Sequence, residues 1–349
     1  MPDIEKVREL QSKVMKDIAA GAIIPIMMIG DELGLFEKLY KFGPCSSNEF
    51  AKKTEMDHRY LREWLLALSA AGYVSYESKT EFFSLSDEQY SVLGDENSPS
   101  LMIGGFENLV GAVHNYHLIK QNFKTGKGTE WGSLHPCCLS GSARFFKPAY
   151  SIFLINKWLP SIKGAVSTLN KGGSFADIGC GFGHSTTMIA EQYPQSSVKG
   201  IDPHEQSIHE AQKIAEQKNL NNLSYEIATA ESYSGEYDII SFFDCLHDMG
   251  DPIAAVSYAK TKLKPGGSLM IIEPYANDEV SKNFNIIGQM YYAFSTIACV
   301  PASKSQEGGM ALGAQAGLKK LKNVLNNGGF SKIEMTYKTA SNMVIEARV

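Results

Sequence analysis

The feature that most constrains the fold is a regular alternation of short apolar segments with helical segments from residue 173 onward. Parallel strands need long connections between them, usually helices, so this alternation predicts a parallel, doubly wound sheet. In such a sheet ligands bind at the carboxyl ends of the strands. The expected strands are SFADIG (174–179), SVKGID (197–202), LSYEIA (223–228), YDIISFFD (237–244) and SLMIIEP (268–274).

The preceding part of the chain is predicted to be mainly helical, with one hairpin. Ser46 stands three residues before Glu49, which is the spacing of a capping box, and Asp57 is placed to cap a second helix that stops at Gly72. Residues 73–86 hold two short alternating segments joined by a polar turn, which predicts a hairpin. Helix, helix and hairpin in this order predict a winged helix.

Composition and charge argue against several classes of protein. The formal net charge of −5 gives no general attraction to nucleic acid or to an anionic membrane. The apolar run AIIPIMMI (22–29) is far shorter than the roughly 20 residues of a membrane span. The charged N-terminal segment is unlike a secretory signal, so we expect a cytoplasmic protein with no membrane association. The six cysteines form no C-x-x-C pair and no sequence cluster with histidine, which argues against structural zinc and a disulfide framework. We therefore expect no metal.

A glycine-rich turn follows the first predicted strand of the sheet. Gly179, Gly181 and Gly183 let the backbone bend sharply and come close to a ligand. A dinucleotide fingerprint would place its third glycine where this chain has His184, so an NAD-dependent oxidoreductase is the weaker alternative. Asp202 ends the next strand, where a carboxylate can accept both hydroxyls of a ribose. The two features together predict a ribose-bearing cofactor.

Four motifs in order resemble those of class I S-adenosylmethionine-dependent methyltransferases: DIGCGFG, GIDPH, FFDCLHDMGDP and LKPGGSLMIIEP. The first half resembles the winged-helix dimerisation domain of small-molecule O-methyltransferases, through DELGLFEKL, SSNEFAKKTEMDHRYLREWLLALSAAGYV and the hairpin. The LHDMGDP form of the third motif resembles a bacterial branch of these enzymes. The resemblance implies an α/β, Rossmann-like doubly wound methyltransferase domain preceded by a mainly helical winged-helix domain.

The resemblance also implies domain bounds, a cofactor and partners. We expect a winged-helix and dimerisation domain over 1–95, a helical linker and substrate-pocket region over 96–165, and the methyltransferase domain over 166–349. The cofactor would be S-adenosylmethionine, and the partner a small-molecule methyl acceptor. Residues 22–36 carry more apolar surface than a small domain covers alone, so we expect a homodimer.

Carried over residue by residue, the resemblance assigns four groups of cofactor contacts. Thr229 stands where relatives often place an acidic residue against the adenine amino group, so either Glu231 or a backbone contact would take that role. Met249 stands where plant enzymes place an adenine-stacking tryptophan. The full set is Asp177, Gly179, Cys180 and Gly181 for the methionine part, Asp202 and Pro203 for the ribose, Thr229, Ala230, Glu231 and Met249 for the adenine, and Phe243 and Asp244 from the fourth strand.

The resemblance assigns the chemistry to His247. In relatives with an LHDW motif this histidine deprotonates the acceptor hydroxyl, and a glutamate at the position of Glu273 orients it. Imidazole titrates near neutral pH, which suits a general base. A second glutamate of the family is replaced here by Ala311. A histidine that only packs at a strand end is the alternative.

The acceptor itself stays open between phenol, carboxylate, amine and carbon nucleophiles. Tyr150, Tyr291 and Tyr292 are the candidate acceptor contacts, with core packing as the alternative. A winged helix can also belong to a transcription regulator with a ligand-binding, methyltransferase-like domain. His58, Arg59 and Arg62 would then face DNA, but the acidic chain and the wide apolar face of that helix make DNA binding unlikely.

Overall fold

The computed structural model describes residues 1–349 and divides into two compact units. The first comprises Met1–Val113 and Pro136–Pro148, and the second comprises His114–His135 and Ala149–Val349. The predicted linker region 96–165 is shared between these units. The three-part division of the chain therefore stays a prediction.

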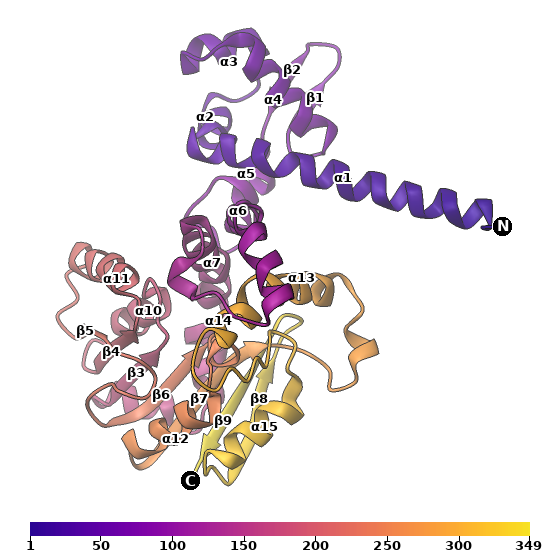
Figure 1. Cartoon of the computed structure of the whole chain (residues 1–349). Coiled ribbons are helices and arrows are strands. Elements are labelled where there is room, and N and C mark those ends of the chain that lie inside the picture. Colours follow the sequence, from indigo (N-terminus) through magenta and orange to yellow (C-terminus); the bar gives the residue numbers. More distant parts are fainter. The chain divides into compact units, whose positions relative to one another are not determined.

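The first unit consists of helices and one antiparallel hairpin (Figure 1). The capping box of Ser46 and Glu49 forms as predicted, and Asp57 caps the fourth helix by accepting two backbone N–H groups. The predicted hairpin is confirmed. The elements are α1 (Ile4–Glu32), α2 (Leu35–Phe42), α3 (Ser47–Thr54), α4 (His58–Ala70), β1 (Ser75–Glu77), β2 (Phe82–Ser84), α5 (Asp87–Leu93), the first part of α6 (Ile103–Thr125) and nearly all of α7 (Pro136–Ala149).

Helix α4 packs its apolar face against α1. Leu61, Trp64, Leu65 and Leu68 are buried, as the helical spacing of the sequence predicts. The indole N–H of Trp64 donates to the Ile26 carbonyl at 2.9 Å. A Cβ at Gly30 would lie 2.6 Å from the Trp64 ring, so this close helix contact requires a glycine.

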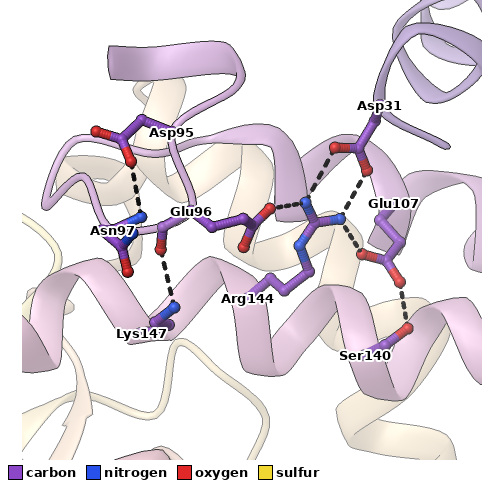
Figure 2. Close-up of polar contacts among 8 residues, drawn as sticks. All are labelled: Asp31, Asp95, Glu96, Asn97, Glu107, Ser140, Arg144 and Lys147. Carbon is purple, nitrogen blue, oxygen red and sulfur yellow. Dashed lines mark hydrogen bonds and ion pairs between the residues drawn. The ribbon is translucent and has the colours of Figure 1, made fainter. Parts of the chain in front are cut away.

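Arg144 on α7 joins three segments of the first unit (Figure 2). Its guanidinium donates to Asp31 of α1 at 2.7 and 3.0 Å and to Glu107 of α6 at 2.8 Å, and it also pairs with Glu96. The hydroxyl of Ser140 donates to Glu107. Burial alone would lower the pKa of Arg144, but the bonds to these carboxylates outweigh it and raise the pKa. Arg144 is therefore a fixed cation that holds α1, α6 and α7 together.

The second unit contains the large sheet and its covering helices (Figure 1). Its strands are β3 (Ser174–Ile178), β4 (Ser197–Asp202), β5 (Leu223–Ile227), β6 (Tyr237–Phe243), β7 (Leu263–Pro274), β8 (Lys332–Lys338) and β9 (Asn342–Arg348). Its α-helices are α8 (Leu159–Ser161), α9 (Ala165–Asn170), α10 (His184–Gln192), α11 (Glu205–Gln217), α12 (Pro252–Lys262), α13 (Ile286–Phe294), α14 (Val300–Lys304) and α15 (Gly317–Asn327). Two π-helical segments, Tyr150–Trp158 and Ser295–Cys299, continue α7 and α13.

The sheet has seven strands in the order β5-β4-β3-β6-β7-β9-β8. The five predicted strands are present and parallel, which confirms the doubly wound arrangement. The prediction is incomplete, because β9 inserts antiparallel between β7 and β8 and makes the sheet mixed. One face is covered by α12 and α15, whose apolar residues join Ile240, Leu269, Ile271 and Ile345 in a single core.

No single helix of the chain is both long and apolar enough to cross a membrane; α1 and α2 pass that test only as a pair, bent by 69°. The expected cytoplasmic location stays a prediction.

We predict that Arg144→Met destabilises the chain. The carboxylates of Asp31 and Glu107 are mostly buried and would then face each other without a cation. We expect the free energy of unfolding to fall by about 3 kcal/mol, the lower end of the cost of breaking a buried ion pair. Urea denaturation followed by circular dichroism measures this change. Arg59→Met is the matched control, because Arg59 and Glu63 form an exposed pair on α4 whose loss should leave stability nearly unchanged. Equal effects of the two substitutions would contradict the role given to Arg144.

Candidate functional site

The order of the strands reverses between β3 and β6. From β3 the chain leads outward to β4 and β5, and it then returns to add β6 and β7 on the other side. Ligands in open α/β sheets bind at the carboxyl ends of the strands at such a switch point. Asp202, Asp244 and Glu273, from β4, β6 and β7, all lie at this edge of the sheet. This arrangement explains why buried strands end in polar residues.

The glycine turn after β3 adopts a backbone that favours glycine. Gly179 and Gly181 have φ values of +72° and +51°. A Cβ at Gly179 would lie 2.8 Å from the Cys245 sulfur, so this side of the turn is closed by the segment after β6. A Cβ at Gly181 would meet no atom within 4 Å. The backbone of Gly181 therefore borders open space, as a ligand-binding turn requires.

Asp202 at the end of β4 fixes the turn from the neighbouring strand. One carboxylate oxygen accepts the N–H of Gly181 at 2.9 Å, and the other accepts the N–H of His204 at 2.8 Å. Burial raises the pKa of the Asp202 carboxyl. An ionised carboxylate has about four acceptor positions. Two of them are used here, so Asp202 can accept two further hydrogen bonds.

Asp177 occupies a different place from the rest of the predicted cofactor set. It is fully buried, and its carboxylate accepts hydrogen bonds from Ser185 at 2.6 Å, Thr186 at 2.8 Å and Ser241 at 3.3 Å. Burial, opposed by these bonds, raises its pKa to about 6. Asp177 thus ties β3 to the start of α10 and to β6. This position supports the glycine turn from behind.

The loop after β5 lies beside Asp202, because the N–H of Ala228 donates to the Asp202 carbonyl at 3.3 Å. Thr229 and Glu231 of this loop are exposed, and Ala230 is half-buried. The Thr229 hydroxyl is hydrogen-bonded to Ser232 at 2.9 Å. Of the other predicted contacts, Pro203 is exposed and Cys180 is buried. The loop and the end of β4 thus lie next to each other.

Asp244, the residue after β6, has a left-handed backbone with φ +50°. Its carboxylate accepts the side-chain N–H of Asn342 at 2.8 Å and the hydroxyl of Tyr150 at 3.4 Å. Burial, reinforced by the charge of Glu273, raises the pKa of Asp244 well above its usual range. The rings of Phe243 and Tyr150 are in contact, with centroids 5.7 Å apart. Tyr150, a predicted acceptor contact, therefore lies next to two predicted cofactor contacts.

His247 lies in the short 3₁₀ turn Leu246–Asp248, and only 3% of it is exposed. Its Nδ1 is hydrogen-bonded to Oε2 of Glu273, the residue expected to orient it. The other oxygen of Glu273 accepts the backbone N–H of His247 at 3.2 Å. Glu273 thus fixes both the ring and the turn that carries it. The Nε2 atom faces away from Glu273.

Two residues that the sequence left without a role surround Nε2 of His247. Oδ1 of Asp248 lies 3.2 Å from Nε2, and the sulfur of Cys299 belongs to the same cluster. The six cysteines are free thiols, and Cys299 clusters with His247 in space, a neighbour that the spacing of the cysteines in the sequence does not show. The sequence does not reveal this contact, because Cys299 lies in the segment Ser295–Cys299, which comes after β7 and is distant in the sequence from His247.

The charges around His247 determine its proton affinity. Burial by itself would lower the pKa of the imidazole, but the carboxylates of Asp248 and Glu273 outweigh it and raise this pKa well above its usual range. Burial raises the pKa of the Cys299 thiol to about 12, with a further contribution from Asp248. The site therefore favours positive charge on or near Nε2.

The tyrosines of α13 differ in burial. Tyr291 is 4% exposed, and burial together with the charges of Asp244, Cys299 and Glu273 raises its pKa. Tyr292 is half-buried. Met249, directly after the 3₁₀ turn, is half-buried, and its carbonyl accepts the hydroxyl of Ser303 at 2.7 Å. Tyr291 therefore shares the environment of His247, whereas nothing comparable places Tyr292 there.

This fold, with its glycine turn and the acidic end of β4, is that of a Rossmann-like doubly wound domain. Residues 169–329 match the family model described as a methyltransferase domain. Residues 21–94 match the model of an Rv2258c-like winged helix-turn-helix domain. The chain thus carries a methyltransferase domain behind a winged helix-turn-helix domain, which confirms the organisation predicted from the sequence.

Curated relatives match part of the chain. The ubiquinone biosynthesis O-methyltransferase of Acinetobacter baylyi is 28% identical over 151 residues, which cover 42% of this chain and 60% of that protein. The trans-aconitate 2-methyltransferase of Deinococcus radiodurans is 30% identical over 105 residues, or 30% of this chain and 39% of that protein. The chain thus spans about 60% or less of the length of these two relatives.

Solved structures match nearly the whole chain. PigF with SAH has a TM-score of 0.72 at 16% identity and covers 97% of this chain and 99% of its own. Human N-acetylserotonin methyltransferase in complex with SAM has a TM-score of 0.69 at 15% identity, with 97% of each chain covered. Mitomycin 7-O-methyltransferase has a TM-score of 0.65 at 17% identity, with 99% and 100% covered. At these identities the likeness shows a shared fold.

Proposed function

We propose that the chain is an S-adenosylmethionine-dependent methyltransferase that methylates a hydroxyl of a small molecule, with His247 as the general base. The observation that carries this proposal is the buried pair of His247 and Glu273 at the same sheet edge as the glycine turn and Asp202. The family match of residues 169–329 supports the methyltransferase class, and the names of the relatives support O-methylation.

The residues at the carboxyl edge fit a ribose-bearing cofactor. Asp202 keeps acceptor capacity for two ribose hydroxyls, and the space in front of Gly181 is open to a ligand. Thr229, Ala230 and Glu231 would flank the adenine together with Met249, and Phe243 and Asp244 would border the methionine part. When bound, S-adenosylmethionine would supply an electrophilic methyl group. Asp177 would act indirectly, because its carboxylate holds the turn in place.

Residues of the chain can take up the proton that the acceptor hydroxyl loses during the transfer. In its neutral form, which gains population as the pH rises toward the raised pKa of the ring, Nε2 of His247 would accept the proton of the acceptor hydroxyl as the oxygen becomes nucleophilic. Glu273 holds the ring by Nδ1 and stabilises the charge that the ring gains. The burial of both residues keeps water from competing for this proton. An acceptor that is already anionic would need no base, and proximity and alignment alone would then carry the transfer.

We also propose a homodimer formed through the first half of α1. The stretch 22–36, which the sequence suggested for this role, is only partly buried: Met27 and Phe36 are in the core of the first unit, whereas Ile29 and Leu33 are exposed. The exposed apolar row lies earlier in the same helix, at 46–66% exposure for Leu10, Val14, Met15 and Ile18. With Val7, Gln11 and Ser12 these residues line a shallow apolar hollow. An exposed row of this kind is stabilised when a second copy covers it.

The regulator alternative has less support from the geometry of α4. Arg59 is paired with Glu63 on that helix, and the apolar face is buried against α1. Sequence-specific DNA binding therefore stays an unlikely outcome. The NAD alternative is weakened by the methyltransferase match over residues 169–329 and by His184, which takes the place of a third glycine.

We predict that Asp202→Ala weakens binding of S-adenosylmethionine by about 2 to 3 kcal/mol, as expected for losing hydrogen bonds to a charged group. Titration calorimetry on the whole chain measures this loss, and NAD should give no heat. Asp238→Ala is the matched control, because Asp238 stands near the start of β6 and is bonded to Ser174 and Lys264. An unchanged affinity of Asp202→Ala would reject the ribose assignment.

We predict that His247→Ala lowers the rate of methyl transfer on the order of 10²- to 10⁴-fold, the usual effect of a positioned base. Cofactor affinity should stay nearly unchanged. Glu273→Gln should also lower the rate, since an amide can hold the ring in the wrong tautomer. A panel of simple phenols, read by mass spectrometry, measures the transfer. His209→Ala on the exposed face of α11 should keep the full rate. A full rate in His247→Ala would reject the base and favour catalysis by alignment alone.

We predict that Val14→Glu with Ile18→Glu converts the dimer to a monomer, because two charges would be buried at the contact. Lys16→Glu is the control: at 100° per residue it lies on the opposite side of α1, and its change should leave the mass unaffected. Light scattering measures the mass of each variant. A monomer mass for the unaltered chain at micromolar concentration would overturn the proposed dimer.

A further inference from the structure

Three different ligand atoms converge beside the proposed catalytic histidine. Nε2 of His247, Oδ1 of Asp248 and the sulfur of Cys299 all lie within 4.8 Å of one another. They come from the 3₁₀ turn after β6 and from the π-helical segment Ser295–Cys299. His247 and Cys299 are buried, and Asp248 is half-buried. Each atom belongs to a group that zinc prefers: imidazole nitrogen, carboxylate oxygen and thiolate sulfur.

The oxygen of Asp248 has an unusual environment for a buried acceptor. Oδ1 is inaccessible to solvent, and it lies 3.2 Å from Nε2 of His247, with the thiol of Cys299 also beside the carboxylate. Two ligand atoms bound about 2.0–2.1 Å from a tetrahedral ion lie about 3.3 Å apart. The spacing of Oδ1 and Nε2 therefore lets both atoms bind one ion, and it also suits the ion pair of Asp248 with a protonated ring.

The surrounding residues hold the ligands in the way that metal sites require. A metal-binding histidine commonly uses its other ring nitrogen to bond a carboxylate, and Glu273 takes that position at Nδ1. The carbonyl of Asp248 accepts the side-chain N–H of Gln306 at 2.9 Å, and the oxygen of the same amide accepts the N–H of Gly250 at 3.1 Å. Gln306 thus fixes the loop that presents Asp248.

We propose that His247, Asp248 and Cys299 form a binding site for a zinc ion, with a fourth coordination position left to water. The thiol of Cys299, and any proton on Nε2, are released to solvent as protons when the ion binds. The nearby carboxylates of Asp248 and Glu273 favour the added positive charge. A zinc ion bound at Nε2 uses the lone pair that would otherwise accept the proton of the acceptor. His247 therefore cannot bind zinc and act as the base at the same time. This last consequence rests on the proposed function, whereas zinc binding itself does not.

The test is direct titration of the whole chain with zinc chloride after chelator treatment, with no cofactor or acceptor present. We expect one zinc per chain. Cys299→Ser and Asp248→Asn should each weaken binding by more than about 100-fold, because even the loss of an outer partner costs about 10- to 100-fold. Cys45→Ser is the matched control, since Cys45 is a buried thiol in the first unit. It should leave the affinity unchanged.

Cobalt chloride provides a second readout that does not depend on the folding of the variants. Co²⁺ in the unaltered chain should give the charge-transfer absorption of a cobalt–thiolate bond, and zinc should remove it by displacement. Absence of this band, or zinc binding that survives Cys299→Ser, would overturn the site. The result is separable from the proposed function: zinc binding without any affinity for S-adenosylmethionine would reject the methyltransferase and keep the metal site.

Discussion

The parallel pairing of β3 with β6 is the contact on which the rest of the candidate site depends. Ile178 and Phe242 are register partners near the ends of these strands, so the chain segments that follow emerge side by side. One segment is the glycine turn, and the other is the stretch that carries Asp244 and His247. The contact of Gly179 with Cys245 shows how closely they approach. A shift of one residue in this register would separate the cofactor contacts from the proposed base.

The carboxyl edge of the sheet brings several acidic side chains together, and these side chains are largely shielded from solvent. Asp177 is balanced by three hydroxyls, Asp244 by an amide and a phenol, and Glu273 by the ring and backbone N–H of His247. Such hydrogen bonds offset the cost of burying a carboxylate. Oδ1 of Asp248 lies 3.2 Å from Nε2 of His247. The carboxylates of Asp248 and Glu273 thus act on the same ring, which is why the cluster favours a proton or a metal cation there.

The sequence predicts those parts of the structure whose signals are local. The capping box at Ser46, the buried face of α4 and the five parallel strands follow from spacing within short stretches. The pairing of His247 with Glu273 can be expected from the sequence, because His247 lies in the turn shortly after β6 and Glu273 lies at the end of the neighbouring strand β7. The strands β8 and β9 were missed, and with them Asn342. Their place in the sheet depends on antiparallel pairing with β7, which no short stretch of sequence reveals.

The partners of the site that escaped prediction share one property. Cys299 and Asn342 are distant in sequence from the residues they approach, and neither stands in a motif. Asp248 was visible in the sequence, but its environment depends on the position of Cys299. Contacts of this kind depend on tertiary packing, which forms only when the whole sheet is assembled.

The position of β9 has a consequence for folding during synthesis. Asp244 adopts a backbone conformation that costs free energy outside glycine, and Asn342 of β9 holds its carboxylate. The five parallel strands leave the ribosome well before β9. Until β9 emerges and inserts beside β7, the end of β6 lacks this support, and the edge of β7 is exposed to wrong partners.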